Sequence, residues 1–288
     1  MPPELFALGT AFFFALHNML TKKGLRYSNP ATAVLSSLII NMLFLWGVSI
    51  LFVPLETLTS PAILIFVLVG FFQPGLTRLL TYKGIETLGI AISDPVRATT
   101  PLFSALMAIL FLGEQMTLTI AMATLLIIGG ITLLSLRGAS ITRYQPIYIL
   151  YPLAASLLAG CSQVLRKVGM GAVPHPILAA AVTASSSFVV SSLTLWIVEK
   201  KQETFKLNKQ CLPWYIGAGV AVSVAMTSIY YALDLGKVTV VIPVASTGPF
   251  FSLLLSALFL RDVERVTLRI VIGAALIVGG VLLITLWK

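Results

Sequence analysis

The strongest constraint on the fold is a series of ten apolar stretches, each close to 20 residues long and joined by short polar connections. About 20 apolar residues are needed for a helix to cross a hydrocarbon core of about 30 Å. A transmembrane β-barrel would instead show alternating segments of about ten residues. We therefore predict an all-α integral membrane protein with ten transmembrane helices. The predicted spans are residues 5–22, 31–53, 61–82, 90–112, 117–136, 147–165, 177–198, 213–233, 238–260 and 268–287.

Composition supports this class and excludes several others. Hydrophobic residues make up 58% of the chain and charged residues 10%, whereas soluble domains carry about 25% charged residues. The basic residues behind the net charge of +9 are spread over short loops, which indicates membrane topology and not nucleic-acid binding. The two cysteines, Cys161 and Cys211, have no metal-ligand neighbours. We expect no disulfide, no metal site and no cofactor.

The second half of the sequence repeats the first with an offset of 144 to 150 residues. The matching pairs include Pro95 with Pro243, Pro101 with Pro249, Tyr82 with Tyr230, and Gly129-Gly130 with Gly279-Gly280. Each half holds five predicted spans, an odd number, so the second half must enter the membrane upside down. We expect two inverted five-helix repeats, residues 1–138 and 139–288, a construction that secondary transporters use.

The distribution of Lys and Arg predicts the orientation. Arg97 lies within a span, and four basic residues fall on the side of the chain ends: Arg166, Lys167, Lys237 and Lys288. The other fourteen of the 19 fall on the opposite side. Because cytoplasmic loops are enriched in basic residues, we predict a multi-pass cell-membrane protein with both ends outside and loop 199–212 in the cytoplasm.

Several of these motifs resemble the EamA-type repeat of the drug/metabolite transporter superfamily. They are Phe111-Leu112-Gly113-Glu114, the earlier Pro101, and Gly129-Gly130, with a second copy that departs from the pattern at Arg261-Asp262. The resemblance implies a ten-helix carrier with a central cavity between two halves, and it leaves the substrate open. It also implies cytoplasmic chain ends. We keep the opposite orientation because the charge count uses this sequence.

The first candidate site residues lie in the fourth span, where Ser93, Arg97, Thr100 and Ser104 fall at helical spacing on one face. As a polar stripe lining a cavity, they would let Arg97 bind a carboxylate or phosphate. Alternatively, Arg97 extends to the membrane surface or pairs with Asp94. Asp94 is either a proton-coupling carboxylate or the N-cap of a helix that begins at Pro95.

Other spans contribute polar residues that are costly in a membrane. In the third span, Gln73-Pro74-Gly75 predicts a kink, whereas the repeat has Ala221-Val222-Ser223 and no such break. The asymmetric break either serves a substrate site that includes Gln73 or is a kink for packing alone. Tyr82 and Tyr230 either close a cavity or belong to an interfacial aromatic belt. His17 either relays protons or forms an interhelical hydrogen bond. The remaining candidate substrate-binding residues are Asn18, Gln163, Ser246 and Thr247, and the candidate hinge residues are Pro74, Pro95, Pro101, Pro243 and Pro249.

Together these patterns predict a secondary transporter, a carrier or exporter, that moves a small polar or anionic metabolite such as an amino acid by alternating access. A flippase for a lipid-linked molecule is an alternative that would need a lateral opening. An intramembrane enzyme would need a catalytic cluster for which the sequence shows no motif. The expected partners are the small-molecule substrate and the lipid bilayer, with protons as a candidate coupling ion. A monomer would suffice, because one chain holds both halves.

Overall fold

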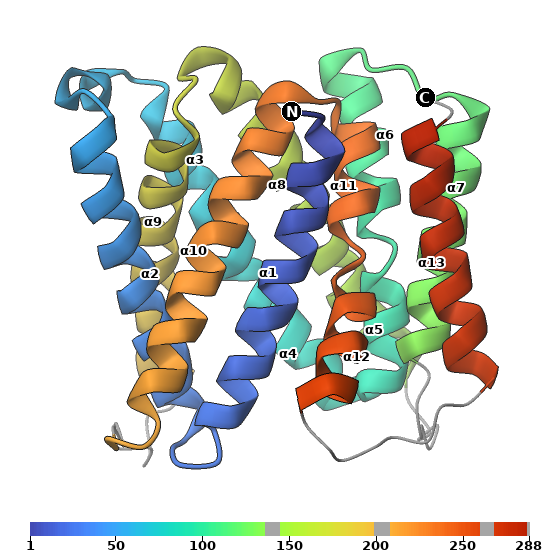
Figure 1. Ribbon diagram of the computed structural model, residues 1–288, viewed down its shortest axis with the longest axis horizontal. Helices are drawn as coiled ribbons and strands as arrows, with labels where there is room; N and C mark the ends of the chain where they lie inside the picture. Colours follow the sequence, from blue (N-terminus) through green and yellow to red (C-terminus); the bar gives the residue numbers. More distant parts are fainter. Residues whose placement is uncertain (136–144, 199–207, 260–267, 287–288) are drawn as a thin grey trace.

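The computed structural model describes residues 1–135, 145–198, 208–259 and 268–286, which form a bundle of helices (Figure 1). The helices are α1 (Pro3–Gly24), α2 (Pro30–Phe52), α3 (Ile63–Gly70), α4 (Thr77–Leu88), α5 (Ile90–Arg97), α6 (Thr100–Leu112), α7 (Leu118–Ser135), α8 (Leu150–Ala172), α9 (Pro176–Val198), α10 (Leu212–Leu235), α11 (Val238–Ala245), α12 (Gly248–Phe259) and α13 (Leu268–Leu286). Short helical turns are η1 (Leu55–Thr59), η2 (Phe71–Leu76) and η3 (Pro146–Ile149). The predictions on loop residues 199–207 and on the 138/139 boundary lie outside the described residues.

Within the described residues, ten helical segments are long and apolar enough to cross a membrane, which confirms the predicted count. The predicted end of the sixth span, at residue 165, is wrong. Helix α8 continues to Ala172, so Arg166 lies inside the bundle and not in a loop. The prediction failed because Arg166 and its neighbour Lys167 resemble a helix end in sequence, while buried polar partners allow the helix to continue.

The fourth and ninth spans are both broken, and at the same repeat position. Helices α5 and α11 end at Arg97 and Ala245, and helices α6 and α12 begin at Thr100 and Gly248. Each end and each start is offset by 148 residues, the spacing of the paired prolines. The proline that follows each break has no backbone N–H for the carbonyl four residues earlier. In the first half, the Thr100 hydroxyl donates to that carbonyl, Arg97 O, at 2.7 Å.

The third span is broken in the first half only, as the sequence predicted. Between α3 and α4 lies η2, in which Gln73 has non-helical angles of φ −136° and ψ 118°. The corresponding part of the second half lies within α10, which runs unbroken from Leu212 to Leu235. This asymmetry places a polar side chain, Gln73, at a point where the backbone leaves the helix.

The two halves interlock through equivalent contacts. Helix α1 packs along α10 and α12 of the second half, and α8 packs along α3, α4 and α6 of the first. The second helices of the two halves, α2 and α9, also pack together, as do the fifth helices, α7 and α13. At the last interface the glycines permit close approach, since a Cβ on Gly130 would lie 2.6 Å from Gly273 O. The equivalent contacts follow the pseudo-two-fold relation expected of inverted repeats.

The two ends of the bundle differ. The chain begins at the end where α1, α7 and α11 start, and the connections from α1 to α2 and from α4 to α5 lie at the other end (Figure 1). We call these the terminal end and the loop end. At the terminal end, Glu114 accepts hydrogen bonds from Val238 N and Thr239 N at 2.8 and 2.9 Å. Glu114 therefore caps the start of α11, and the contact joins the two halves.

Candidate functional site

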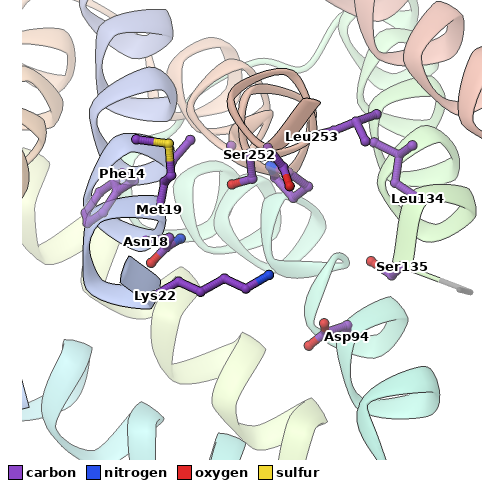
Figure 2. A pocket seen from close by; sticks show the side chains of 13 residues that line it. Phe14, Asn18, Met19, Lys22, Asp94, Leu134, Ser135, Ser252 and Leu253 are labelled. Carbon is purple, nitrogen blue, oxygen red and sulfur yellow. The ribbon is translucent and has the colours of Figure 1, made fainter. Parts of the chain in front are cut away.

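A cavity of about 530 Å³ lies toward the loop end of the bundle, between α1, α5, α7 and α12 (Figure 2). Polar and apolar side chains from both halves line it. The lining residues include Phe14, Asn18, Met19, Lys22, Asp94, Leu134, Ser135, Pro249, Ser252 and Ser256. Three of the predicted site residues, Asn18, Asp94 and Pro249, therefore lie together in one cavity. Its volume falls within the range of small-molecule pockets, about 300–1,000 Å³.

Opposite charges face this cavity from different walls. In Figure 2, the Lys22 side chain extends from α1 toward the side where Asp94 and Ser135 lie. Within the described residues, no ion pair within 4.0 Å joins Lys22 and Asp94. Asp94 is half-buried and Lys22 is exposed. Both charges are therefore available to a polar molecule inside the cavity.

The N-cap interpretation of Asp94 is wrong. Helix α5 begins at Ile90, directly after Gly89, whose φ of 79° lies in the region that favours glycine. Asp94 and Pro95 consequently lie inside the helix, so the Asp94 side chain does not begin it. Its placement on the cavity wall leaves the proton-coupling role as the open hypothesis.

Arg97 and Tyr82 lie close to Asp94 but are not among the residues that line the cavity. Arg97 lies three residues after Asp94, about one turn further along α5. Its side chain is exposed, and Tyr82 is 55% exposed. These residues extend a polar region from the cavity toward α4.

Several other predicted site residues use their hydroxyl groups locally. Thr100 Oγ1 donates to Arg97 O at 2.7 Å, as noted above, and Ser246 Oγ donates to Ile242 O at 2.8 Å. Thr247 Oγ1 donates to Val244 O at 2.8 Å. Ser93 is fully buried, and its hydroxyl faces α4 at Gly84. None of these four side chains is among the residues that line the cavity.

His17 connects two helices. Its Nδ1 lies 3.0 Å from Ala218 O of α10, the interhelical contact that the sequence allowed. Arg78 Nη1 is buried and has no hydrogen-bond partner within the described residues.

A second polar cluster is buried among α3, α8, α9 and α10. Gln163 Nε2 donates to Gln73 Oε1 at 3.2 Å, and Arg166 Nη1 donates to Gln163 Oε1 at 3.0 Å. The Arg166 guanidinium lies over the ring of Tyr230, 5.5 Å from its centroid. The Tyr230 hydroxyl is hydrogen-bonded to Thr183. Tyr230 is fully buried, so it does not belong to an interfacial aromatic belt.

Two charged residues of these clusters were missed as site candidates. Lys22 and Arg166 were both counted as loop charges. The repeat itself carried a usable signal, because Lys22 and Arg166 occupy matching positions in the first helices of the two halves. Two adjacent basic residues, repeated near the end of an apolar span in both halves, mark this position.

Within the described ranges, no three His, Cys, Asp or Glu side chains gather as a metal site would require. The cavity and the second cluster offer amide, hydroxyl, ammonium and guanidinium groups, with Asp94 as the cavity's carboxylate. Such a set favours binding of a polar molecule through hydrogen bonds and charge.

Comparisons with known proteins now identify the family. The model of the EamA-like transporter family matches residues 1–136 and 146–286. An uncharacterised protein of Methanocaldococcus jannaschii is 35% identical over 94 residues, which span 33% of this chain and 67% of that protein. A solved crystal structure covers 99% of this chain and 96% of its own chain with a TM-score of 0.82 at 16% identity, which shows a shared fold. The chain therefore belongs to the EamA-like transporter family of the drug/metabolite transporter superfamily, whose members are membrane transporters.

Proposed function

We propose that the protein is a secondary carrier that moves a small polar or anionic metabolite, such as an amino acid, by alternating access. The observation that carries this proposal is the 530 Å³ cavity, which has Lys22 and Asp94 on different walls and lies at one end of the bundle. Ionisable groups inside membrane spans are costly and tend to mark substrate or ion pathways. The sequence holds no ATP-binding motif, so transport is facilitated or driven by an ion gradient.

The difference between the two ends supports alternating access. The cavity lies toward the loop end, while at the terminal end Glu114 holds α11 of the opposite half. A carrier that alternates between two openings has one end closed in each state, and inverted repeats permit the mirrored state. The matched breaks at Pro101 and Pro249 place an irregular backbone in both halves, where such rocking would occur.

Counterflow into liposomes tests the proposal. Purified protein should exchange at least one labelled amino acid, carboxylate or phosphate ester saturably, above the rate of protein-free liposomes. Loss of a hydrogen bond to a charged group costs about 1.5–3 kcal/mol, so Asp94→Asn and Lys22→Gln should each lower kcat/KM about tenfold or more. Arg269→Gln, an exposed charge in α13, is the matched control and should transport normally. Normal exchange by both cavity variants would remove this cavity from the transport path.

Proton coupling is tested in the same liposomes. If Asp94 carries the coupling proton, a pH gradient should drive uptake by the wild-type protein, and Asp94→Asn should exchange substrate without responding to the gradient. Wild-type uptake that ignores the gradient would exclude protons as the coupling ion.

A further inference from the structure

Arg166 is buried without a negative partner. Only 7% of the residue is exposed, and no carboxylate of the described residues lies within 4.0 Å of it. Its Nη1 donates to Gln163 Oε1 at 3.0 Å, but its Nε is buried and has no hydrogen-bond partner. A buried charge is strongly unfavourable unless it is paired and its donors are satisfied. The described residues therefore provide no anionic partner for Arg166.

The adjacent residue shows how this helix satisfies a cation that has a purely structural role. Lys167 Nζ donates to the carbonyl oxygens of Leu233 at 2.6 Å and Asp234 at 3.2 Å. These carbonyls lie at the end of α10, where the last backbone oxygens have no partner within the helix. Arg166 contacts only neutral groups instead, namely the amide of Gln163 and the ring and hydroxyl of Tyr230. These contacts orient the guanidinium without neutralising it.

The orientation suits an oxyanion. Because Nη1 serves Gln163, Nε lies on the other edge of the guanidinium, where a carboxylate or phosphate accepts two parallel hydrogen bonds. The guanidinium lies over the ring of Tyr230, and the hydrogen bond between the Tyr230 and Thr183 hydroxyls fixes that ring. The group is thus held in place before any ligand arrives.

Gln73 adds a further donor near this cluster. Its carbonyl oxygen accepts from Gln163, so its amide nitrogen can donate. The break at η2 brings this side chain out of regular helix geometry. The cluster is therefore rich in donors, and it contains no charged acceptor among the described residues.

We propose that Arg166, together with Gln163 and Gln73, forms a subsite for the oxyanion head group, carboxylate or phosphate, of the transported molecule. This deepens the proposed function and rests on it. The subsite assigns the role of anion partner to Arg166, whereas the sequence had suggested the exposed Arg97.

The subsite lies deeper than the cavity. At 1.5 Å per residue, Arg166 is about 24 Å along α8 from its loop-end start, whereas Asp94 is about 6 Å along α5. Arg78 belongs to α4, which follows Gln73 in the chain, and its unpartnered Nη1 is a further buried donor.

Anion binding without transport is the direct test. The thermal midpoint of purified protein in detergent is measured against sodium acetate and sodium phosphate, with sodium chloride at matched ionic strength. We expect one of the two oxyanions to raise the midpoint saturably. Arg166→Gln should weaken its apparent Kd at least tenfold, and Arg269→Gln should bind like the wild type. Stabilisation by acetate would indicate a carboxylate substrate, and stabilisation by phosphate would indicate a phosphorylated one.

The anion-free midpoint separates a binding role from a structural one. If Arg166 awaits an anion, removing its charge relieves an unfavourable burial, so Arg166→Gln and Arg166→Met should melt no lower than the wild type. Arg166→Lys should retain a weaker oxyanion response, because the charge remains but the planar edge is lost. A wild-type oxyanion response in Arg166→Gln, or none in the wild type, would overturn the subsite.

Counterflow then distinguishes the subsite from the proposed function. An Arg166→Gln protein that transports with an unchanged KM would refute the subsite and leave the carrier function standing. An intact oxyanion response in a protein that exchanges no metabolite would refute the carrier function alone.

Discussion

Replacing Glu114 should open the terminal end of the bundle. The Glu114 carboxylate accepts three hydrogen bonds from the first turn of α11: from Val238 N at 2.8 Å, and from Thr239 N and Thr239 Oγ1 at 2.9 Å. Glu114 belongs to the connection between α6 and α7, so the contact joins the first half to the second. It also places a negative charge at the N-terminus of α11, where the helix dipole favours it.

The magnitude follows from the burial of the donors. Val238 and Thr239 are fully buried, so Glu114→Ala leaves two backbone N–H groups and a hydroxyl without this acceptor. Each stranded donor costs about 1–3 kcal/mol, and the helix cap that is lost is worth about 1 kcal/mol. Glu114 is only half-buried, so water will replace part of the lost hydrogen bonding in Glu114→Ala. We therefore expect the substitution to destabilise the closed terminal end by about 3 kcal/mol in total. Since 1.4 kcal/mol changes an equilibrium constant tenfold, the ratio of closed to open terminal end should fall about a hundredfold.

Cysteine labelling measures this opening. In a background with Cys161 and Cys211 replaced by Ser, a reporter cysteine at the buried Val240 of α11 should react slowly with a soluble maleimide. Adding Glu114→Ala should raise its rate by a factor between ten and a hundred. Gln115→Ala, an exposed neighbour, is the matched control and should leave the rate unchanged. An unchanged rate and thermal midpoint in Glu114→Ala would refute the idea that this carboxylate closes the terminal end.

Two further predictions concern packing and orientation. Gly130→Ala should destabilise the α7–α13 interface by about 1–3 kcal/mol, because the added Cβ would overlap Gly273 O. Gly129→Ala is the control and should be neutral, because nothing lies within 4 Å of a Cβ at that position. Equal thermal midpoints for the two variants would contradict this prediction. Lys209→Cys should resist an impermeant maleimide in intact cells and react after permeabilisation, because the basic loops are predicted to be cytoplasmic. Labelling of intact cells would reverse the predicted orientation.

Much of the fold was predictable because it depends on local chemistry. The length of the apolar stretches sets the number of spans, and the prolines at 101 and 249 remove backbone donors at matching places. The kink at Gln73-Pro74-Gly75 has the same local cause. Each of these features can be identified within a few residues of sequence.

The polar interior was less predictable because it depends on contacts between distant segments. The sequence places Arg166 in a loop, because the residues that surround it are distant in the chain. Its partner Tyr230 lies in α10, and Gln73, the partner of Gln163, lies in η2. Asp94 was assigned to a possible N-cap because Asp-Pro often begins a helix, but the Gly89 turn begins this one earlier. Which wall a side chain faces follows from the packing of the halves, which sequence spacing alone does not specify.

The most direct test of the central claim is counterflow in liposomes that contain wild-type protein or Asp94→Asn, screened with labelled amino acids, carboxylates and phosphate esters. We predict saturable exchange of at least one of these compounds by the wild type and a loss of about tenfold or more in the variant. Exchange at the level of protein-free liposomes for every compound would contradict a carrier of small polar or anionic metabolites.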